Sequence, residues 1–536
     1  MKVRALSVVV AGIVAGTVSA SASVFQYCVQ IPAGKGQAPA YLWIPPAAKH
    51  VRGVVMGNMT LMEREMSKDE QVRKACADER LAIVFLKCGM NTNTVQRVLD
   101  EFAKVSGYKE LSQAPLFFVG HSAGGPPARQ LAQTMADRCF GLCQYRGGGP
   151  WGGQSVPPGV PCLMMVGQFD EFGGTMRDDN GREGAWQGAC EEMARFRATN
   201  EARLASIVVE PGAGHFAWSD RNAAYLSMFI RKAAQARIPE AWPTDAEGPV
   251  ALKAVDFKSG WLTDLSLRTA GKVSPALYDK YEGEKANTAW HFDREIAEAT
   301  VAYHAGLTGK KDQFIKWNDP YWVDAGTRFF FTSLKWIGDG QTFEVHPVYA
   351  DAYPGQQPNG GGPRWTDAGK PVGHSTAPIK LKLVSGPVAP VGNTAFRMQY
   401  DSLAPATEGA RVTFMAYSEG DADYRYTEHV GMMPRGFGGL TGGREQAITF
   451  PPPANLKVGG EPAELKATSD SGLPVEYYVA YGPAVVKDGK LSVADLPARA
   501  VFPIEVKVVA CQFGSGVAPQ VKTAKPVEQV LVVEKR

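Results

Sequence analysis

The sequence has no dense run of lysine or arginine beyond its first residues, and its charges nearly balance, with 57 Lys and Arg against 54 Asp and Glu. Proteins that bind nucleic acid gather basic residues in one run or on one face. We therefore expect no nucleic-acid partner. Tight Cys-x-x-Cys pairs and histidine clusters are also missing, which argues against a structural metal site.

Long apolar runs are absent after the first 22 residues. Residues 1–22 begin with a basic start, continue through an apolar stretch and end in the small residues Ala20-Ser21-Ala22. This pattern is typical of a secretory signal peptide, cleaved after Ala22 or, as second choice, after Ala20. The stretch is shorter than the about 20 residues that a membrane helix needs. We expect a mature chain without a membrane span, secreted to the periplasm or the medium of a bacterium.

The eight cysteines lie mostly in the first 190 residues. Export permits disulfides, so Cys139 with Cys143, or Cys76 with Cys88, are candidate pairs. The sequence alone does not fix their connectivity.

Residues 28–240 alternate short apolar runs with amphipathic stretches, which predicts a mostly parallel, doubly wound α/β sheet. The expected strands are Tyr41 to Ile44, Val51 to Met56, Leu81 to Leu86, Leu116 to Val119, Phe140 to Tyr145, Leu163 to Val166 and Ile207 to Glu210. Two helical stripes are expected to pack on this sheet, with apolar residues at Val95, Val98, Leu99, Phe102 and at Ala128, Leu131, Ala132, Met135. A chain of 536 residues needs further domains beyond this one.

Beyond residue 250 the alternation ends. Pro- and Gly-rich turns separate β-prone runs such as Thr342 to Val345 and Val412 to Tyr417, with one expected helix at Phe292 to His304. This predicts a middle module, 250–445, that is mostly β and of unknown function. The last section, 448–536, has the strand spacing of a small sandwich. Its expected strands are Val475 to Ala480, Ala484 to Val486, Ile504 to Ala510 and Val530 to Val533.

The strongest chemical signal is Gly120-His121-Ser122-Ala123-Gly124. It stands directly after one expected strand and directly before one expected helix, which is the strand, turn, helix order of a nucleophile elbow. The two glycines leave room for a strained backbone at the serine. We expect Ser122 to be a nucleophile and His121 to be a packing residue.

A serine nucleophile needs a base and an acid to orient that base. Asp170 follows one expected strand, and His215 follows the next. Strand ends of a parallel sheet meet at one edge, so these side chains can converge on Ser122. We predict Asp170 as the acid, with Glu171 as the alternative, and His215 as the base.

The negative oxygen of an acyl-transfer intermediate needs two backbone N–H donors. One is expected at Ala123, the residue after the nucleophile. The other is expected in the loop after Val51 to Met56, at Met59 or, as second choice, at Asn58. This loop departs from the usual His-Gly pattern.

With these motifs, residues 28–236 resemble the α/β-hydrolase family, and within it secreted esterases and depolymerases. The resemblance implies cleavage of carboxylic esters of small molecules or polymers, including polysaccharides, by an acyl-enzyme mechanism without a cofactor. The tail resembles a bacterial immunoglobulin-like domain. The motifs behind this second resemblance are Ser471-Gly472-Leu473-Pro474-Val475, Tyr481-Gly482-Pro483-Ala484, Lys487-Asp488-Gly489-Lys490-Leu491 and Val509-Ala510-Cys511-Gln512-Phe513-Gly514.

The Gly-rich loop 147–153 presents Trp151, which is either a wall of the substrate pocket or an ordinary packing residue. Two other functions stay open. The same triad suits a secreted serine peptidase, and the later modules suit a surface carbohydrate-binding protein with a secondary hydrolase domain.

Overall fold

The computed structural model describes most of the chain. The described residues are 24–58, 60–151, 155–170, 172, 175–177, 184–242, 248–266, 273–307, 309–319, 322–324, 329–355, 364–409, 411–433 and 438–536. The predicted signal peptide, 1–22, lies outside them.

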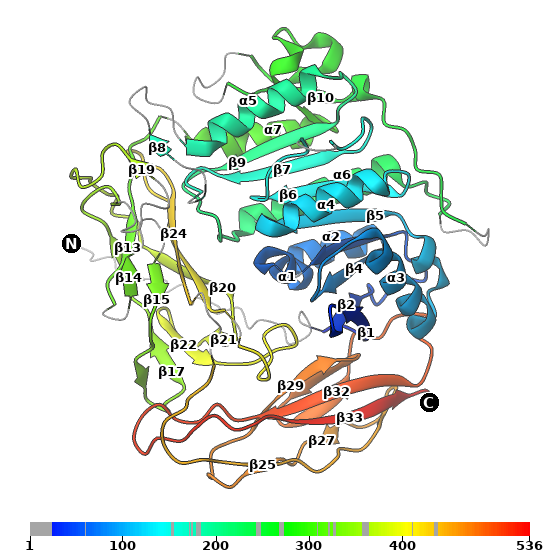
Figure 1. Cartoon of the computed structure of the whole chain (residues 1–536), viewed down its shortest axis with the longest axis vertical. Coiled ribbons are helices and arrows are strands. Elements are labelled where there is room, and N and C mark those ends of the chain that lie inside the picture. The colour runs from blue at the N-terminus through cyan, green and yellow to red at the C-terminus, as the bar shows by residue number, and fades with distance from the viewer. Residues whose placement is uncertain are drawn as a thin grey trace, which may run out of the picture.

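Eight strands form a central sheet in the order β1-β2-β4-β3-β5-β6-β7-β9 (Figure 1). They are β1 (Tyr27–Ala33), β2 (Gly36–Trp43), β3 (Gly53–Asn58), β4 (Leu81–Leu86), β5 (Leu116–His121), β6 (Cys139–Tyr145), β7 (Cys162–Gly167) and β9 (Ala205–Glu210). The β1–β2 and β2–β4 pairs are antiparallel, and all later pairs are parallel. All residues of β3 to β7 and β9 are buried, as expected for parallel strands covered on both faces.

Helices cover both faces of this sheet. They are α1 (Leu61–Lys68), α2 (Glu70–Asp78), α3 (Thr92–Ser106), α4 (Gly125–Thr134), α5 (Gly184–Ala198) and α6 (Asp220–Arg237). Apolar residues of α3 and α4 share one core with the sheet, and those of α1, α2 and α6 share another. Both predicted stripes are buried in the first core.

The order of the strands, the leading antiparallel hairpin and the sharp turn between β5 and α4 define the α/β-hydrolase fold. The predicted fold class is therefore confirmed. The sequence analysis missed β1 and the first half of β2, whose residues alternate between buried and exposed at the edge of the sheet.

The first part of the predicted middle module packs on the far edge of this sheet. A small sheet of β10 (Trp261–Asp264), β11 (Ala276–Leu277) and β12 (Thr288–His291) precedes α7 (Arg294–His304), close to the expected helix. The hydroxyl of Ser206 on β9 donates to the carbonyl of Trp290, and the amide of Val209 donates to Nε2 of His304 at 2.9 Å. The segment therefore extends the hydrolase core.

The rest of the middle module is built of β-sheets, as predicted, and stands beside the central sheet (Figure 1). One sheet has the order β14-β15-β24-β23-β20, and another β16-β17-β22-β21. Their strands are β14 (Trp322–Asp324), β15 (Phe329–Phe331), β16 (Trp336–Ile337), β17 (Thr342–Glu344), β20 (Lys380–Ser385), β21 (Val388–Pro390), β22 (Ala395–Met398), β23 (Thr413–Ser418) and β24 (Thr427–Met432). Two short pairs join β13 (Ile315–Trp317) to β18 (Pro347–Tyr349) and β19 (Arg364–Trp365) to β8 (Thr175–Arg177).

The C-terminal section lies beneath β1 and β2 in Figure 1 and is also all β. Its sheets have the orders β26-β33-β32-β29, β27-β31-β30 and β25-β28. The strands are β25 (Ile448–Thr449), β26 (Leu456–Lys457), β27 (Ala463–Glu464), β28 (Thr468–Ser469), β29 (Glu476–Tyr481), β30 (Ala484–Lys487), β31 (Lys490–Val493), β32 (Ile504–Cys511) and β33 (Val527–Glu534). Hydrogen bonds from Gly482 to Phe25 and from Arg499 to Tyr108 dock it on the hydrolase region. The immunoglobulin-like assignment stays a prediction.

The two candidate disulfides are not formed, because all eight cysteines are free. Cys139 and Cys143 lie on the same strand, β6, four residues apart. An extended strand separates such residues by about 13 Å, well beyond the span of a disulfide. Cys76 and Cys88 are both buried without a bond between them. In the part of the chain described, no helix combines the length and the hydropathy needed to cross a bilayer.

Candidate active site

Ser122 lies in the sharp turn that joins β5 to α4. Its φ of 52° is in the left-handed region, which a non-glycine residue adopts only at a cost. The turn is too tight for a side chain at its first glycine, since a Cβ on Gly120 would lie 2.2 Å from the carbonyl oxygen of Gly124. Ser122 itself is partly exposed where β5 ends at the carboxyl edge of the sheet.

Asp170 and His215 form a hydrogen-bonded pair at the same edge. Nδ1 of His215 lies 2.9 Å and 3.1 Å from the two carboxylate oxygens of Asp170. Both side chains are largely buried, at 5% and 12% exposed. Burial by itself would raise the pKa of Asp170, but the hydrogen bond from His215 and the charges nearby hold this pKa below its ordinary value. An ionised carboxylate only accepts, so Nδ1 carries the proton and Nε2 is the basic nitrogen.

His121 connects the serine turn to the loop of His215. Its Nε2 donates to the carbonyl oxygen of His215 at 3.1 Å, and the two rings are 5.0 Å apart at their centroids. Burial lowers the pKa of His121 to about 3, so this ring is neutral at ordinary pH. His121 thus links the residue next to Ser122 with the loop of the predicted base. The alternative acid, Glu171, lies outside the described residues.

Glu63 of α1 clamps the backbone under the serine turn and was missed by the sequence analysis. Its Oε1 accepts the amide of His121 at 2.7 Å, and its other oxygen is hydrogen-bonded to the hydroxyl of Thr60. Thr60 in turn donates to the carbonyl of His121 at 3.0 Å. Burial raises the pKa of Glu63 to about 8. The protonated carboxyl and Thr60 therefore hold both backbone polar groups of His121, the residue before Ser122.

The predicted oxyanion donors are only partly within the described structure. Ala123 is exposed in the first turn after Ser122, where helix-start N–H groups lack partners within the helix. Met59 lies outside the described residues. Asn58, the second choice, is the buried last residue of β3, and its side-chain amide donates to Cys88 at 3.2 Å.

The indole of Trp151 packs near Gly149 and Phe196. A Cβ on Gly149 would lie 2.4 Å from the indole, and the ring of Phe196 is 6.3 Å away at its centroid. The side chain is partly exposed. Packing accounts for much of this environment, and a role in substrate binding stays a prediction.

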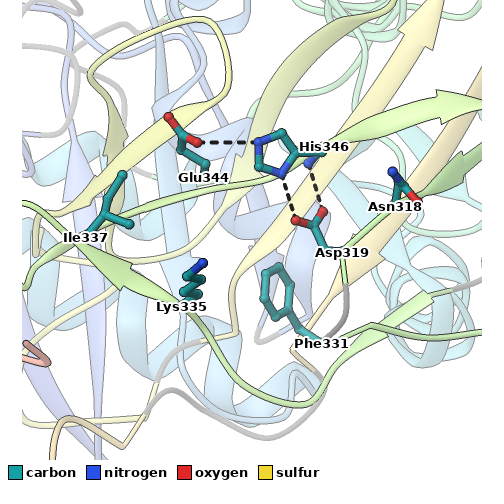
Figure 2. Close-up of a pocket in the computed structure, with 7 residues that line it drawn as sticks. All are labelled: Asn318, Asp319, Phe331, Lys335, Ile337, Glu344 and His346. Atoms are coloured by element: carbon teal, nitrogen blue, oxygen red, sulfur yellow. Dashed lines mark hydrogen bonds and ion pairs between the residues drawn. The ribbon is translucent and has the colours of Figure 1, made fainter.

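A second Asp–His pair lines a hollow of about 200 Å³ in the middle module (Figure 2). Nδ1 of His346 lies 2.8 Å from Asp319, and its Nε2 lies 3.4 Å from Glu344. The lining residues are Asn318, Asp319, Phe331, Lys335, Ile337, Glu344 and His346. None of these seven lining residues carries a hydroxyl or a thiol.

Among the described residues, no group of three or more His, Cys, Asp or Glu side chains is arranged to hold a metal ion.

No family model and no curated protein is significantly similar to the chain. Solved structures similar to it include a dienelactone hydrolase from Anabaena variabilis, with 13% identity and a TM-score of 0.28 over 40% of this chain and 100% of that one. A monoglyceride lipase from Saccharomyces cerevisiae has 11% identity and a TM-score of 0.26 over 40% and 96%. Est1E from Butyrivibrio proteoclasticus has 13% identity and a TM-score of 0.25 over 38% and 96%. Likenesses this distant say nothing of the substrate.

Proposed function

We propose that the chain is a secreted serine esterase that cleaves carboxylic esters through Ser122, His215 and Asp170. The observation that carries the proposal is the strained serine turn at the sheet edge, whose His121 contacts the buried His215, with Nδ1 of His215 hydrogen-bonded to Asp170. Strain at a non-glycine residue points to function when the surroundings impose it. Glu63, Thr60 and the glycines of the turn impose it here.

The proposed reaction begins when Oγ of Ser122 attacks the ester carbonyl and passes its proton to Nε2 of His215. Asp170 holds the ring and stabilises the imidazolium as it forms. Backbone N–H groups of Ala123 and Met59 are the proposed donors to the negative oxygen. The imidazolium then protonates the leaving alcohol. Water, activated by the same ring, releases the acid from the serine without a cofactor.

We propose an ester of a carbohydrate or a polymer as the substrate. The signal-peptide pattern of residues 1–22 supports export, which brings the enzyme to extracellular polymers. Trp151 is the proposed aromatic contact for the substrate, because this residue is partly exposed.

The test is hydrolysis of a short-chain aryl ester by the purified chain and by Ser122→Ala. We expect the variant to lose activity by about 10⁴-fold or more. Ser112→Ala is the matched control, since Ser112 lies before the opposite end of the same strand, β5. Acetyl, feruloyl and polyester substrates then define the ester class. Peptide cleavage without ester cleavage, or polymer binding without either, would contradict the proposal.

A further inference from the structure

The loop that carries His215, residues 211–219, is held from within the hydrolase region by Arg146. We name it the histidine loop. The Arg146 guanidinium donates to the carbonyls of Gly214 and Ala217, on both sides of His215, the second at 3.2 Å. Arg146 follows β6 with a φ of 49°, and its side chain is 1% exposed. A guanidinium so buried depends on the carboxylates that face it.

The hydrolase region supplies one carboxylate to this cluster. Glu210, the last residue of β9, lies 2.5 Å from Nη2 of Arg146. It also accepts from Ser219 and Asn222, each at 2.5 Å, and lies 3.5 Å from Arg221. Two guanidinium groups therefore share one carboxylate within this region.

The second acidic side chain comes from the middle module. Glu428, on β24, is 7% exposed, and its Oε2 accepts the hydroxyl of Tyr426 at 2.7 Å. The Arg221 guanidinium lies 4.1 Å from the centroid of the Tyr426 ring. Burial and the charge of Glu210 raise the pKa of Glu428, and Arg146 and Arg221 oppose this rise. The charges of Glu210, Arg146 and Arg221 therefore act on Glu428, while its hydrogen bond to Tyr426 and the contact of that ring with Arg221 connect it to the hydrolase region.

The backbone of the middle module also touches the histidine loop. Gly212 has a φ of 68°, and a Cβ at this position would lie 2.7 Å from the carbonyl oxygen of Tyr426. Figure 1 shows β24 beside the central sheet. The loop is thus enclosed between the hydrolase region on one side and the segment entering β24 on the other.

We propose that the segment Tyr426 to Glu428 of the middle module is the outer wall of the histidine loop, and that Glu428 is a positioning residue that keeps His215 at Ser122. The inference rests on the proposed function for its catalytic consequence. The middle module is then part of the hydrolytic unit, because the loop of the base is completed by a strand about 200 residues later in the chain.

The test compares Glu428→Ala and Glu428→Gln in the full-length chain, with kcat expressed per site titrated by an aryl phosphonate. We expect Glu428→Ala to lower kcat by roughly tenfold with KM within about twofold, because a small displacement of a catalytic group slows chemistry more than binding. Glu428→Gln keeps the shape and an acceptor for Tyr426, so it should restore kcat to within about threefold of the unmodified protein. A purely structural role would change the number of titrated sites and leave kcat per site intact.

Amide hydrogen exchange of the peptide 211–219 gives a readout that needs no activity. Exchange should be roughly tenfold faster in Glu428→Ala and in Gly212→Ala, and unchanged in Glu344→Ala, the matched control from the same module. Unaltered kcat per site and unaltered exchange in both loop variants would overturn the inference. Faster exchange in a protein that hydrolyses no ester would support the wall and contradict the proposed function instead.

Discussion

The described part of the chain contains two Asp–His pairs with nearly equal hydrogen-bond distances and very different surroundings. Asp170 and His215 are 2.9 Å apart at the edge of a parallel sheet, with the imidazole 5% exposed. Asp319 and His346 are 2.8 Å apart in the hollow of the middle module, with the imidazole 49% exposed. The N···O distances within the two pairs therefore do not distinguish them. The difference lies in what surrounds each histidine.

The first pair shares the sheet edge with the strained Ser122, which follows β5, and its loop has carbonyls that are held by Arg146. The second has carboxylates and a lysine around it, and no hydroxyl or thiol among its lining residues. An Asp–His pair becomes a catalytic unit only when a nucleophile and a fixed loop accompany it. The predictions below test this contrast, from the largest expected effect to the smallest.

The histidines of the two pairs should differ most in their effect on rate. We expect His215→Ala to lower kcat/KM for an aryl ester by about 10⁴-fold to 10⁶-fold, because the serine loses its base. His346→Ala should leave kcat/KM within about twofold. Steady-state kinetics on both variants checks this. Comparable losses of kcat/KM in the two variants would show that the two Asp–His pairs do not differ in function.

The two carboxylates should differ in the same direction. Asp170→Asn is expected to lower kcat by about 10⁴-fold, because an amide at this position favours the wrong imidazole tautomer. Asp319→Asn keeps the serine site intact and should leave kcat unchanged. Full activity of Asp170→Asn would show that another residue orients His215.

The buried surroundings of the serine should also show in the pH dependence of stability. Burial raises the pKa of Glu63 from its ordinary value of 4.5 to about 8 in the folded chain, so the folded state keeps a proton that the unfolded state has lost. Its contribution is therefore present below pH 4.5 and declines by about 1.4 kcal/mol per pH unit up to about pH 8.

Denaturant unfolding from pH 5 to 8 measures this slope. Glu63→Gln should flatten it relative to the unmodified chain, while Glu344→Gln, at the exposed pair, should not. Parallel slopes for all three proteins would mean that Glu63 ionises as freely in the folded chain as in the unfolded one.

The smallest effect is expected at the exposed pair. The hydrogen bond that Nδ1 of His346 donates to Asp319 raises the pKa of His346. The pair then stabilises the fold fully below pH 6.5, and this contribution is lost as the pH rises through the raised value. Since His346 is half-exposed, less than about 1 kcal/mol is at stake. Histidine NMR should show the titration midpoint of His346 falling toward 6.5 in Asp319→Asn, and an unmoved midpoint would refute the assignment.

The sequence predicted the parts of the site that local pattern encodes. Ser122 stands in a five-residue motif between a strand and a helix, and Asp170 and His215 each follow an apolar strand. Because parallel strands end at the same edge of a sheet, the predicted sheet was enough to place the three residues at one edge. The structure brings Asp170 and His215 into hydrogen-bonding distance. The edge strand β1 was missed because its alternating burial gives a weaker apolar run.

The supporting residues were not predicted because their partners lie far away in the chain. Glu63 meets the backbone of His121 after 58 residues, and Glu428 joins a cluster assembled from β6 and β9. A partial signal existed for Arg146 and Glu210, which stand at the ends of two parallel strands and so share the edge of the site. No local pattern marks Glu428, since only the packing of the two modules brings it to the loop.

The most direct measurement is peptide mapping by mass spectrometry after reaction with an aryl phosphonate, which phosphonylates activated serines. One adduct on Ser122 is expected in the unmodified chain, none in His215→Ala, and full labelling in His346→Ala. An unlabelled Ser122, or equal labelling of Ser122 with and without His215, would contradict the account.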